Sequence, residues 1–454
     1  MIFFAKSTRV KEFVAKGMRN PNIQGYLIRL IIGFLMHVGR MSASRAAESV
    51  RTESRHRANV MRFLAKSGVD ASNWMNLYWM AVLALEQERQ REGEWLFILD
   101  QTFCSQQGKK AENTYSMGNR KRRPKKGSRY NRKTAPRTVH AYVMGLLITP
   151  GGVRLPVCKP YYTKSYCEKK QRPYRKQTEL AAELIAELSV SEKAKVIVLG
   201  DTAYEAKTIR TACAKRGYTW IVPINPERVL AGAKPRPKVR TLVVEMTAND
   251  FAPVRLDPTK GRYVAQRRLS RCRIGSKKKT RTFYVHSETR EVHSVGMVQL
   301  VFSCKEQPQP GKAIPLSKIL MTNDTTRLAA SVVELYSLRW QIELFFKELK
   351  SMLGFHQYRF GRFEKVEGWV QASLLTFLFL EWTRARKLRQ RGLDEKQRKW
   401  WQAQRTYGLT RAVRQQAEEG ELLELARLTK TRTGRRKLIK TLRAANALEY
   451  RMPL

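Results

Sequence analysis

Hydrophobic and polar positions follow different periods in different parts of the chain, and these changes predict its organisation. Residues 1–93 repeat apolar positions with a helical period, whereas residues 94–224 mix short apolar runs with helical stretches. Residues 225–325 consist of short alternating segments between turns rich in Pro, Gly and Lys. Residues 326–385 return to a helical pattern, and residues 386–454 are helical and strongly basic. We therefore predict five regions with these boundaries.

The second region carries the pattern of a sheet that is covered on both faces. Continuous apolar runs at 95–100, 195–201 and 218–223 predict buried strands, and amphipathic stretches at 177–188 and 203–215 predict helices. Buried strands that alternate with helices at this spacing are typical of a mixed α/β sheet. We therefore predict an α/β fold for this part of the chain.

Turn signals divide the remaining strand-like pattern into hairpins. Pro150-Gly-Gly joins apolar runs at 139–149 and 153–158, which predicts a hairpin inside the second region. In the third region the alternating segments predict strands at 241–247, 263–269, 282–286, 295–302 and 319–322. These strands favour a separate all-β insertion in the α/β domain.

The net charge of the chain limits the classes of partner that it is expected to bind. Lys and Arg number 88 against 38 Asp and Glu, which gives a formal net charge of +50. Nucleic acid is the leading partner because a phosphate track lets many cations release condensed counterions, and an anionic membrane surface is the alternative. No apolar stretch approaches the roughly 20 residues that a bilayer helix needs, so we expect no membrane span.

Several classes of site are disfavoured by the motifs. The chain has no CxxC, HxxxH or HExxH pattern, which argues against zinc and against a disulfide framework. It has no P-loop and no dinucleotide-binding glycine fingerprint, so no nucleotide cofactor is expected. Six scattered cysteines and no secretory signal favour reduced thiols in a cytoplasmic protein.

The N-terminal region contains a candidate DNA-binding motif. Two short helical patterns at 42–50 and 55–64 flank a polar turn. As a helix-turn-helix, this segment would turn Arg51, Arg55 and Arg57 toward DNA. The alternative is an ordinary helical hairpin with a basic solvated face.

A basic loop between the first two expected core strands is the second candidate DNA contact. Residues 119–133 include Arg120, Arg122, Lys125 and Lys126, together with a tyrosine and a proline. Cations at this density suit contact with a DNA backbone. The alternative is a charged loop that stays disordered without DNA.

Two carboxylates stand at the ends of expected buried strands. Asp100 ends the run at 95–100, and Asp201 ends the run at 195–201. An acid in this position can project into a cleft, but it can also simply cap the following turn. Taken singly, each aspartate fits the capping alternative better.

A helical stripe supplies a third carboxylate. At about 100° per residue, Tyr336, Arg339, Glu343 and Lys350 share one narrow face, and four apolar residues lie on another. The alternative is a solvated face with an Arg339–Glu343 pair. Combined with the two strand-end acids, Glu343 would complete a three-carboxylate site.

Three carboxylates in one cleft repel one another unless cations neutralise them. Their hard oxygens suit two Mg²⁺ ions, for which Mn²⁺ can substitute. Asp100, Asp201 and Glu343 are therefore the predicted catalytic and metal-binding residues of an in-line phosphodiester displacement. Arg339 and Lys350 would grip the phosphates of the substrate strand.

The spacing Tyr336-x2-Arg339-x3-Glu343-x6-Lys350 resembles the Y-(2)-R-(3)-E-(6)-K signature of the IS-four family of prokaryotic insertion-sequence transposases, kin of the Tn-five transposase. The segments around Asp100 and Asp201 resemble the two Asp motifs of that family's DDE core. The resemblance implies an RNase H-like core in residues 94–224 and 326–385, interrupted by the β-rich insertion and flanked by helical N-terminal and C-terminal regions.

The resemblance also implies an activity. The protein would be a DNA transposase that binds the terminal inverted repeats of its element, hydrolyses phosphodiester bonds with Mg²⁺ and transfers the ends into target DNA. It would act as a homodimer at the nucleoid of a prokaryotic cell, with Tyr336, Arg339 and Lys350 on the DNA backbone. Members often cut through a DNA hairpin with a flipped base, for which Tyr263, Phe283, Tyr284 or Phe302 could stack.

Two other functions stay open at this point. A different RNase H-fold nuclease would share the three acids without the Tyr/Arg/Lys stripe. A transposase descendant that only binds DNA would act as a regulator and would not need the intact acids.

Overall fold

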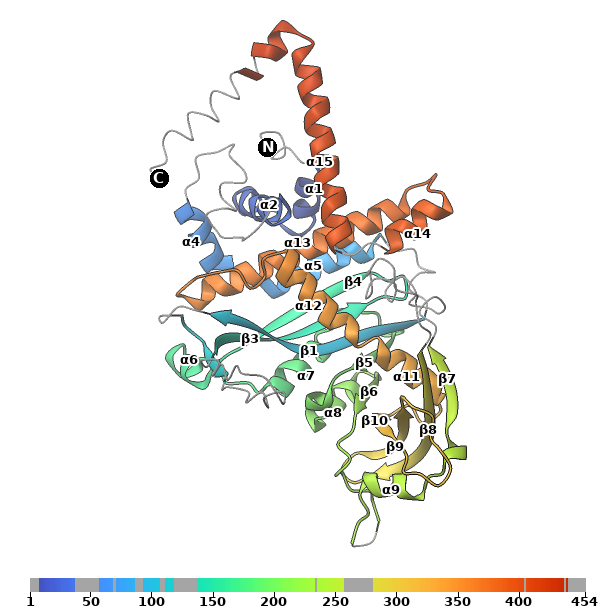
Figure 1. Cartoon of the computed structure of the whole chain (residues 1–454). Coiled ribbons are helices and arrows are strands. Elements are labelled where there is room, and N and C mark those ends of the chain that lie inside the picture. Colours follow the sequence, from blue (N-terminus) through green and yellow to red (C-terminus); the bar gives the residue numbers. More distant parts are fainter. Residues whose placement is uncertain are drawn as a thin grey trace, which may run out of the picture.

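The residues described in the computed structural model are arranged around one ten-stranded sheet, with helical regions toward both ends of the chain (Figure 1). The structure describes residues 8–36, 57–67, 71–85, 93–106, 111–117, 137–232, 235–256, 281–403, 406–436 and 438–439. No described helix combines the length and the apolar character that crossing a membrane requires.

Five strands form the core of the sheet in the order β4–β3–β1–β5–β6. They are β1 (Glu94–Gln106), β3 (Arg137–Ile148), β4 (Arg154–Tyr161), β5 (Lys195–Leu199) and β6 (Thr219–Pro223). β1, β5 and β6 are parallel, while β3 is antiparallel to both β1 and β4. This order agrees with an RNase H-like core, and the predicted mixed α/β class is confirmed.

The local sequence explains why these strands form. β5 consists of one lysine followed by Val-Ile-Val-Leu, and its four apolar residues are buried. A continuous β-branched run of this kind suits a central parallel strand that is covered on both faces. The short strand β2 (Tyr115–Met117) pairs with the start of β3, and the predicted hairpin at 139–158 is confirmed as β3 and β4.

Helices that connect the strands cover the sheet. The two main ones are α7 (Gln177–Ala186), which packs on β3 and β4, and α8 (Lys207–Lys215), which contacts α7 and β6. α6 (Lys164–Lys169) is a short helix that precedes α7. The single helix predicted at 203–215 is divided, because a 3-10 turn, η3 (Thr202–Tyr204), precedes α8.

The third region continues the same sheet beyond β6. Its elements are α9 (Val239–Glu245), η4 (Ala248–Asp250), β7 (Ala252–Leu256), β8 (Arg281–Val292), β9 (Gly296–Cys304) and β10 (Leu316–Thr322). The order β6–β10–β9–β8–β7 shows that the strands of this region extend the core sheet. The strand predicted at 263–269 lies outside the described residues.

The strand predicted at 241–247 is wrong, because this segment belongs to helix α9. Its β-branched composition favoured a strand. In the structure Val239 and Leu242 are buried at helical spacing, whereas Val244 is 85 % exposed. Burial of one helical face therefore outweighs the local propensity.

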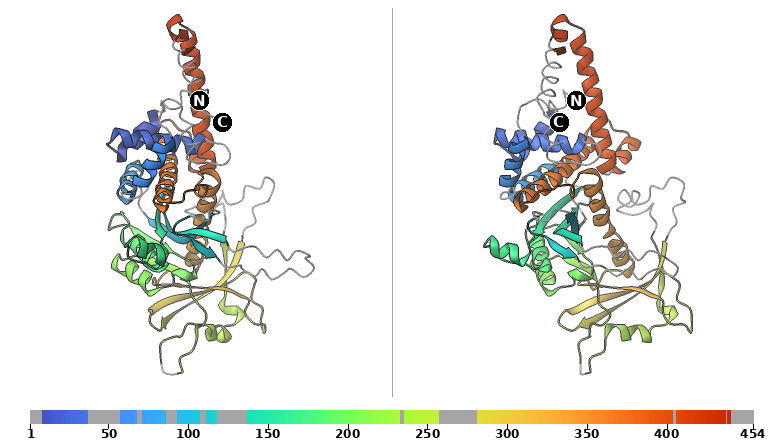
Figure 2. Two further views of the ribbon diagram at one scale, coloured as in Figure 1. Left: turned by 90° about the vertical axis from the view of Figure 1, so that its left-hand side faces the viewer. Right: turned by 60° about the vertical axis from the view of Figure 1, so that its left-hand side comes forward.

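Helices from both ends of the chain pack together on one side of the sheet (Figure 1). The long helix α13 (Phe363–Arg389) contacts the N-terminal helices α1 (Thr8–Gly17), α2 (Pro21–Met36), α4 (Arg57–Ser67) and α5 (Ala71–Leu83). The helix predicted at 55–64 corresponds to α4, and the one at 42–50 lies outside the described residues. α14 (Glu395–Ala403) follows α13, and α15 (Thr406–Thr429) projects away from the body (Figure 2).

A buried ion-pair network ties the core hairpin to the C-terminal helices. Arg154 on β4 contacts Glu381 of α13 at 2.8 Å and Glu348 of α12 (Trp340–Met352) at 2.9 Å. Arg384 also pairs with Glu381. The Glu381 side chain is fully buried, so its charge depends on these two guanidinium groups.

Candidate active site

Two parallel strands bring the first two carboxylates to the same level of the sheet. The expectation that Asp100 ends its strand is wrong, because β1 continues to Gln106 through its pairing with β3. β1 and β5 pair in register up to Ile98 and Leu199. Asp100 and Asp201 each lie two residues beyond this last pair. Because neighbouring parallel strands carry equivalent residues to the same height, the two acids end up near one another.

The turn after β5 fixes the direction of Asp201. Its Oδ1 accepts a hydrogen bond of 2.9 Å from the N–H of Ala203, so Asp201 caps η3 as the capping alternative expected. A Cβ on Gly200 would lie 2.7 Å from the Cβ of Tyr204, which explains the glycine before the acid. Capping and proximity to Asp100 are compatible, since capping occupies only one carboxylate oxygen.

The helical stripe is divided between two helices rather than carried by one. α11 (Ala329–Ser337) ends just before Arg339, and α12 begins at Trp340. Backbone bonds of the 3-10 type span this junction, including those from the N–H of Arg339 to the carbonyl of Tyr336 and from Ile342 to Arg339. Side chains three residues apart are eclipsed in such a turn, so Tyr336 and Arg339 align.

Arg339 joins two of the three acids. Its guanidinium donates to Asp100 at 3.1 Å and to Glu343 at 2.7 Å. The side chains of Asp100 and Arg339 are each 17 % exposed, and that of Glu343 is 33 % exposed. The site is therefore half-buried and open to solvent on one side, as access to a long polymer requires.

The pKa of Asp100 depends on the charges of both other acids. Burial raises the pKa of Asp100, and the nearby charges of Asp201 and Glu343 raise it further. A hydrogen bond from the N–H of Gln101 and the charge of Arg339 act in the opposite direction. Carboxylates that are close enough to disfavour one another's ionisation attract cations.

The buried face of α12 and of the junction before it anchors Glu343. Leu338 at the junction and Ile342, Phe345 and Leu349 of α12 are almost fully buried, as the periodicity predicted. Glu343 lies in the first turn of α12, where the partial positive charge of the helix N-terminus favours an acid. Packing and helix position together hold the third carboxylate toward β1.

The two outer residues of the stripe also face the site region, but in different ways. Tyr336 is buried, and this burial raises its pKa to about 12, so the phenol stays protonated at neutral pH. Lys350 donates to the backbone carbonyl of Phe103 at 2.9 Å, three residues beyond Asp100 on β1. It therefore contacts the same strand and not the acids themselves.

Lys318 is a cation near the acids that the sequence analysis missed. It lies on β10, and its ammonium stands 4.8 Å from the centre of the Tyr336 ring. Burial lowers the pKa of Lys318, Arg339 lowers it further, and Asp201 acts in the opposite direction. No local motif marks this lysine, because only the pairing of β10 with β6 brings it to the site.

The three carboxylates are suitable ligands for a hard divalent cation, but they are not arranged as a preformed metal site. No group of three or more His, Cys, Asp or Glu side chains in the described part of the chain is placed to hold an ion. Arg339 instead supplies positive charge between Asp100 and Glu343. Carboxylate oxygens are nevertheless the hard ligands that divalent cations of this kind prefer.

The other predicted DNA contacts cannot be placed. The described residues do not include Arg51, Arg55, Arg120, Arg122, Lys125 and Lys126. Arg57 begins α4, but its side chain is not among those described.

The aromatic candidates for base stacking differ in exposure. Phe302 is fully buried on β9, so the expectation that it could stack on a base is wrong. Phe283 and Tyr284 on β8 are half-buried, and Tyr263 lies outside the described residues. Trp340, at the start of α12, is 53 % exposed.

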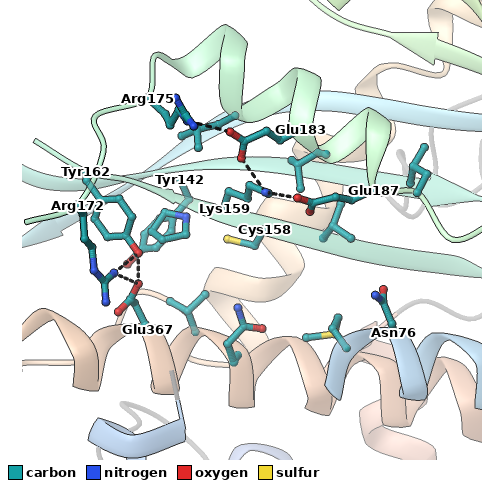
Figure 3. Close-up of a pocket in the computed structure, with 18 of the residues that line it drawn as sticks. Asn76, Tyr142, Cys158, Lys159, Tyr162, Arg172, Arg175, Glu183, Glu187 and Glu367 are labelled. Carbon is teal, nitrogen blue, oxygen red and sulfur yellow. Dashed lines mark hydrogen bonds and ion pairs between the residues drawn. The ribbon is translucent and has the colours of Figure 1, made fainter. Parts of the chain in front are cut away.

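A cavity of about 730 Å³ lies away from the three acids, between α7, β4, α5 and α13 (Figure 3). Its charged groups are paired with one another: Lys159 contacts Glu183 and Glu187, and Glu367 accepts from Tyr162. None of the three acids lines it. We therefore place the candidate chemistry at the three acids and not in this cavity.

Comparison with known families covers all three acids. Residues 19–242 match the family described as DDE superfamily endonuclease, and residues 173–379 match the family described as transposase DDE domain. The first match includes Asp100 and Asp201, and the second includes Asp201 and Glu343. A comparison with curated proteins finds no significant match.

Proposed function

We propose that this chain is an active metal-dependent cut-and-paste transposase of the IS-four type. Its matches to a transposase DDE domain and to a DDE superfamily endonuclease support its assignment to the DDE transposases. Its substrate would be the terminal inverted repeats of its own element, followed by target DNA. Asp100, Asp201 and Glu343 would be the catalytic residues. The protein would act in the cytoplasm of a prokaryotic cell, at the nucleoid.

One observation carries the proposal. Arg339 bridges Asp100 and Glu343, and the charge of Asp201 acts on Asp100. Residues from β1, the turn after β5, and the start of α12 thus meet at one half-buried point. A structural ion pair would need only one acid, whereas phosphodiester chemistry needs several.

The three acids would hold two Mg²⁺ ions, which would activate the attacking water or 3′-hydroxyl and stabilise the leaving oxygen. Arg339 would leave the carboxylates and grip a phosphate of the scissile strand with its planar fork. Tyr336, protonated at neutral pH, can donate a hydrogen bond beside Arg339. Lys350, on the β1 side, would contact the backbone further along the strand.

The net charge of +50 supports a longer DNA track than one active site needs. The predicted contacts at Arg51, Arg55, Arg57 and the loop around Arg120–Lys126 would bind the duplex outside the site. A homodimer would hold two element ends together. If cleavage runs through a DNA hairpin, the exposed indole of Trp340 beside Arg339 offers a stacking face in addition to Tyr284.

The decisive experiment uses the native protein with Mg²⁺ and two duplexes of equal length. One carries the terminal inverted repeat of the element, and the other is scrambled. Cleavage and joining restricted to the repeat duplex are expected. Equal cleavage of both duplexes would instead indicate a nuclease without transposition, and binding without cleavage would indicate a regulator.

Arg339 should compete with metal for the two acids that it bridges. In the absence of DNA, Arg339→Gln is expected to tighten Mg²⁺ binding by up to about fivefold. This factor corresponds to the free energy of one partly exposed ion pair, which Mg²⁺ would no longer have to break. The readout is the rise in melting temperature with added Mg²⁺, because an ion that binds only the folded state stabilises it. Unchanged or weaker Mg²⁺ binding in the variant would contradict competition.

A further inference from the structure

Three cations from different elements approach one another beside the acids. Lys318 lies on β10, Lys305 directly follows β9, and Arg339 stands at the start of α12. The positive charges of Arg339 and Lys305 both act on Lys318. Residues distant in sequence thus contribute positive charge beside the candidate active site.

Two of these three cations have no ion-pair partner within the part of the chain that the structure describes. Arg339 pairs with Asp100 and Glu343, but neither Lys318 nor Lys305 has an ion-pair partner among the described residues. Both lysines are exposed. Like charges held close together cost free energy, and an external anion that binds between them removes this cost.

The position of Lys318 is set from two sides. The backbone of β10 pairs with β9 at Lys318 and Ser303, and β10 continues into pairing with β6. The ring of Tyr336 lies under the ammonium at 4.8 Å, which favours a cation there without neutralising it. Lys318 is therefore held in place while its charge stays available to solvent.

The charge of Asp201 also reaches Lys318. A phosphate bound by Lys318 would consequently lie next to the acid site and not at a remote surface. The exposed Lys305 extends the same positive surface away from Asp201, along the inserted strands. This arrangement fits a chain of phosphates and not a single small anion.

We propose that Lys318 and Lys305 form a backbone-binding subsite that holds the DNA strand on the β9–β10 side of the active site. The inference rests on the proposed function, because it assigns a path to the strand that the three acids would cut. Lys318 is a positioning residue: it holds the phosphate neighbouring the scissile one, while Arg339 grips the scissile strand. Lys305 binds the next part of the backbone.

Salt dependence of DNA binding tests this subsite. The logarithm of the binding constant falls with the logarithm of salt concentration by about 0.9 for each duplex phosphate that is neutralised. Lys318→Gln and Lys305→Gln should each reduce the slope by about 0.9, and the double variant by about 1.8. Lys318→Arg should keep the native slope. The probe is the terminal-repeat duplex, measured without Mg²⁺ so that no cleavage occurs.

Lys312→Gln is the matched control, because Lys312 is also exposed in the segment between β9 and β10. It should leave the slope unchanged. A native slope in Lys318→Gln, or an equal loss in Lys312→Gln, would overturn the subsite. Failure of the subsite is distinguishable from failure of the proposed function, because the latter fails if the native protein neither cuts nor joins the repeat duplex.

Discussion

Replacing Glu343 with glutamine is expected to lower Mg²⁺-dependent cleavage of terminal-repeat DNA by about 100-fold or more while leaving DNA binding intact. Changing a residue that only hydrogen-bonds to a metal ligand lowers metal affinity or activity by about 10- to 100-fold. Loss of a ligand itself should lower activity at least as much. The amide keeps the shape of the side chain but removes the charge that would hold a cation. Cleavage on denaturing gels and binding by mobility shift measure the two effects separately.

The matched control for this variant is Glu192→Gln. Glu192 is exposed in the turn before β5, so its replacement changes the net charge equally without touching the site. It should cleave like the native protein. Native-like cleavage by Glu343→Gln would remove Glu343 from the catalytic residues, and loss of DNA binding would mean that the variant is misfolded or that Glu343 acts elsewhere.

Glu381→Gln should cause the largest loss of stability. Burial opposes ionisation of Glu381, yet the charges of Arg384 and Arg154 outweigh this effect and lower its pKa. The variant leaves two largely buried guanidinium groups without their shared carboxylate. Breaking a buried ion pair from one side costs about 3–5 kcal/mol of unfolding free energy, measurable by chemical denaturation.

An exposed ion pair provides the comparison. Glu395 pairs with Lys399 one turn away on α14, and both side chains are mostly exposed. Glu395→Gln should leave the free energy of unfolding nearly unchanged, because solvent screens such pairs. A similar loss in both variants would show that the Arg154–Glu381 network has no special role in stability.

The predictions for Glu343 and Glu381 both concern helix α12. Arg154 contacts Glu381 of α13 and also Glu348, which lies on α12 five residues after Glu343. The network therefore connects the β3–β4 hairpin to the helix that carries the third acid. We expect Glu381→Gln to weaken cleavage below the temperature at which the protein unfolds, as Glu343 loses its fixed position relative to β1.

Much of the site could be predicted because its signals are local. A continuous apolar run that ends in an acid marks both Asp100 and Asp201. Asp201 follows the end of β5 as predicted, whereas Asp100 lies within β1, which continues to Gln106 through its pairing with β3. Helical periodicity correctly separated the buried face of Leu338, Ile342, Phe345 and Leu349 from the face with Glu343. Side-chain period and strand length depend on neighbours along the chain, which the sequence displays directly.

Other features have no local signature. Nothing in the apolar pattern separates α11 from α12 at Arg339, and β-branched residues made the α9 segment resemble a strand. The 3-10 junction depends on how α11 packs beside β6, β8 and β9, and α9 depends on the burial of Val239 and Leu242. In both places packing between distant segments outweighs the preference of the residues themselves.

The sequence by itself determined the candidate residues: two acids that end apolar runs, a third acid in the Tyr/Arg/Glu/Lys spacing, and a strongly basic chain around them. Only the tertiary structure decided which charges meet. In the structure Arg339 lies between Asp100 and Glu343, and Lys350 contacts a backbone carbonyl of β1. Lys318, on β10, lies against the ring of Tyr336 beside the site. The reason is physical: a local period fixes the face on which a side chain lies, whereas its partners depend on strand pairing and helix docking between segments far apart in the chain.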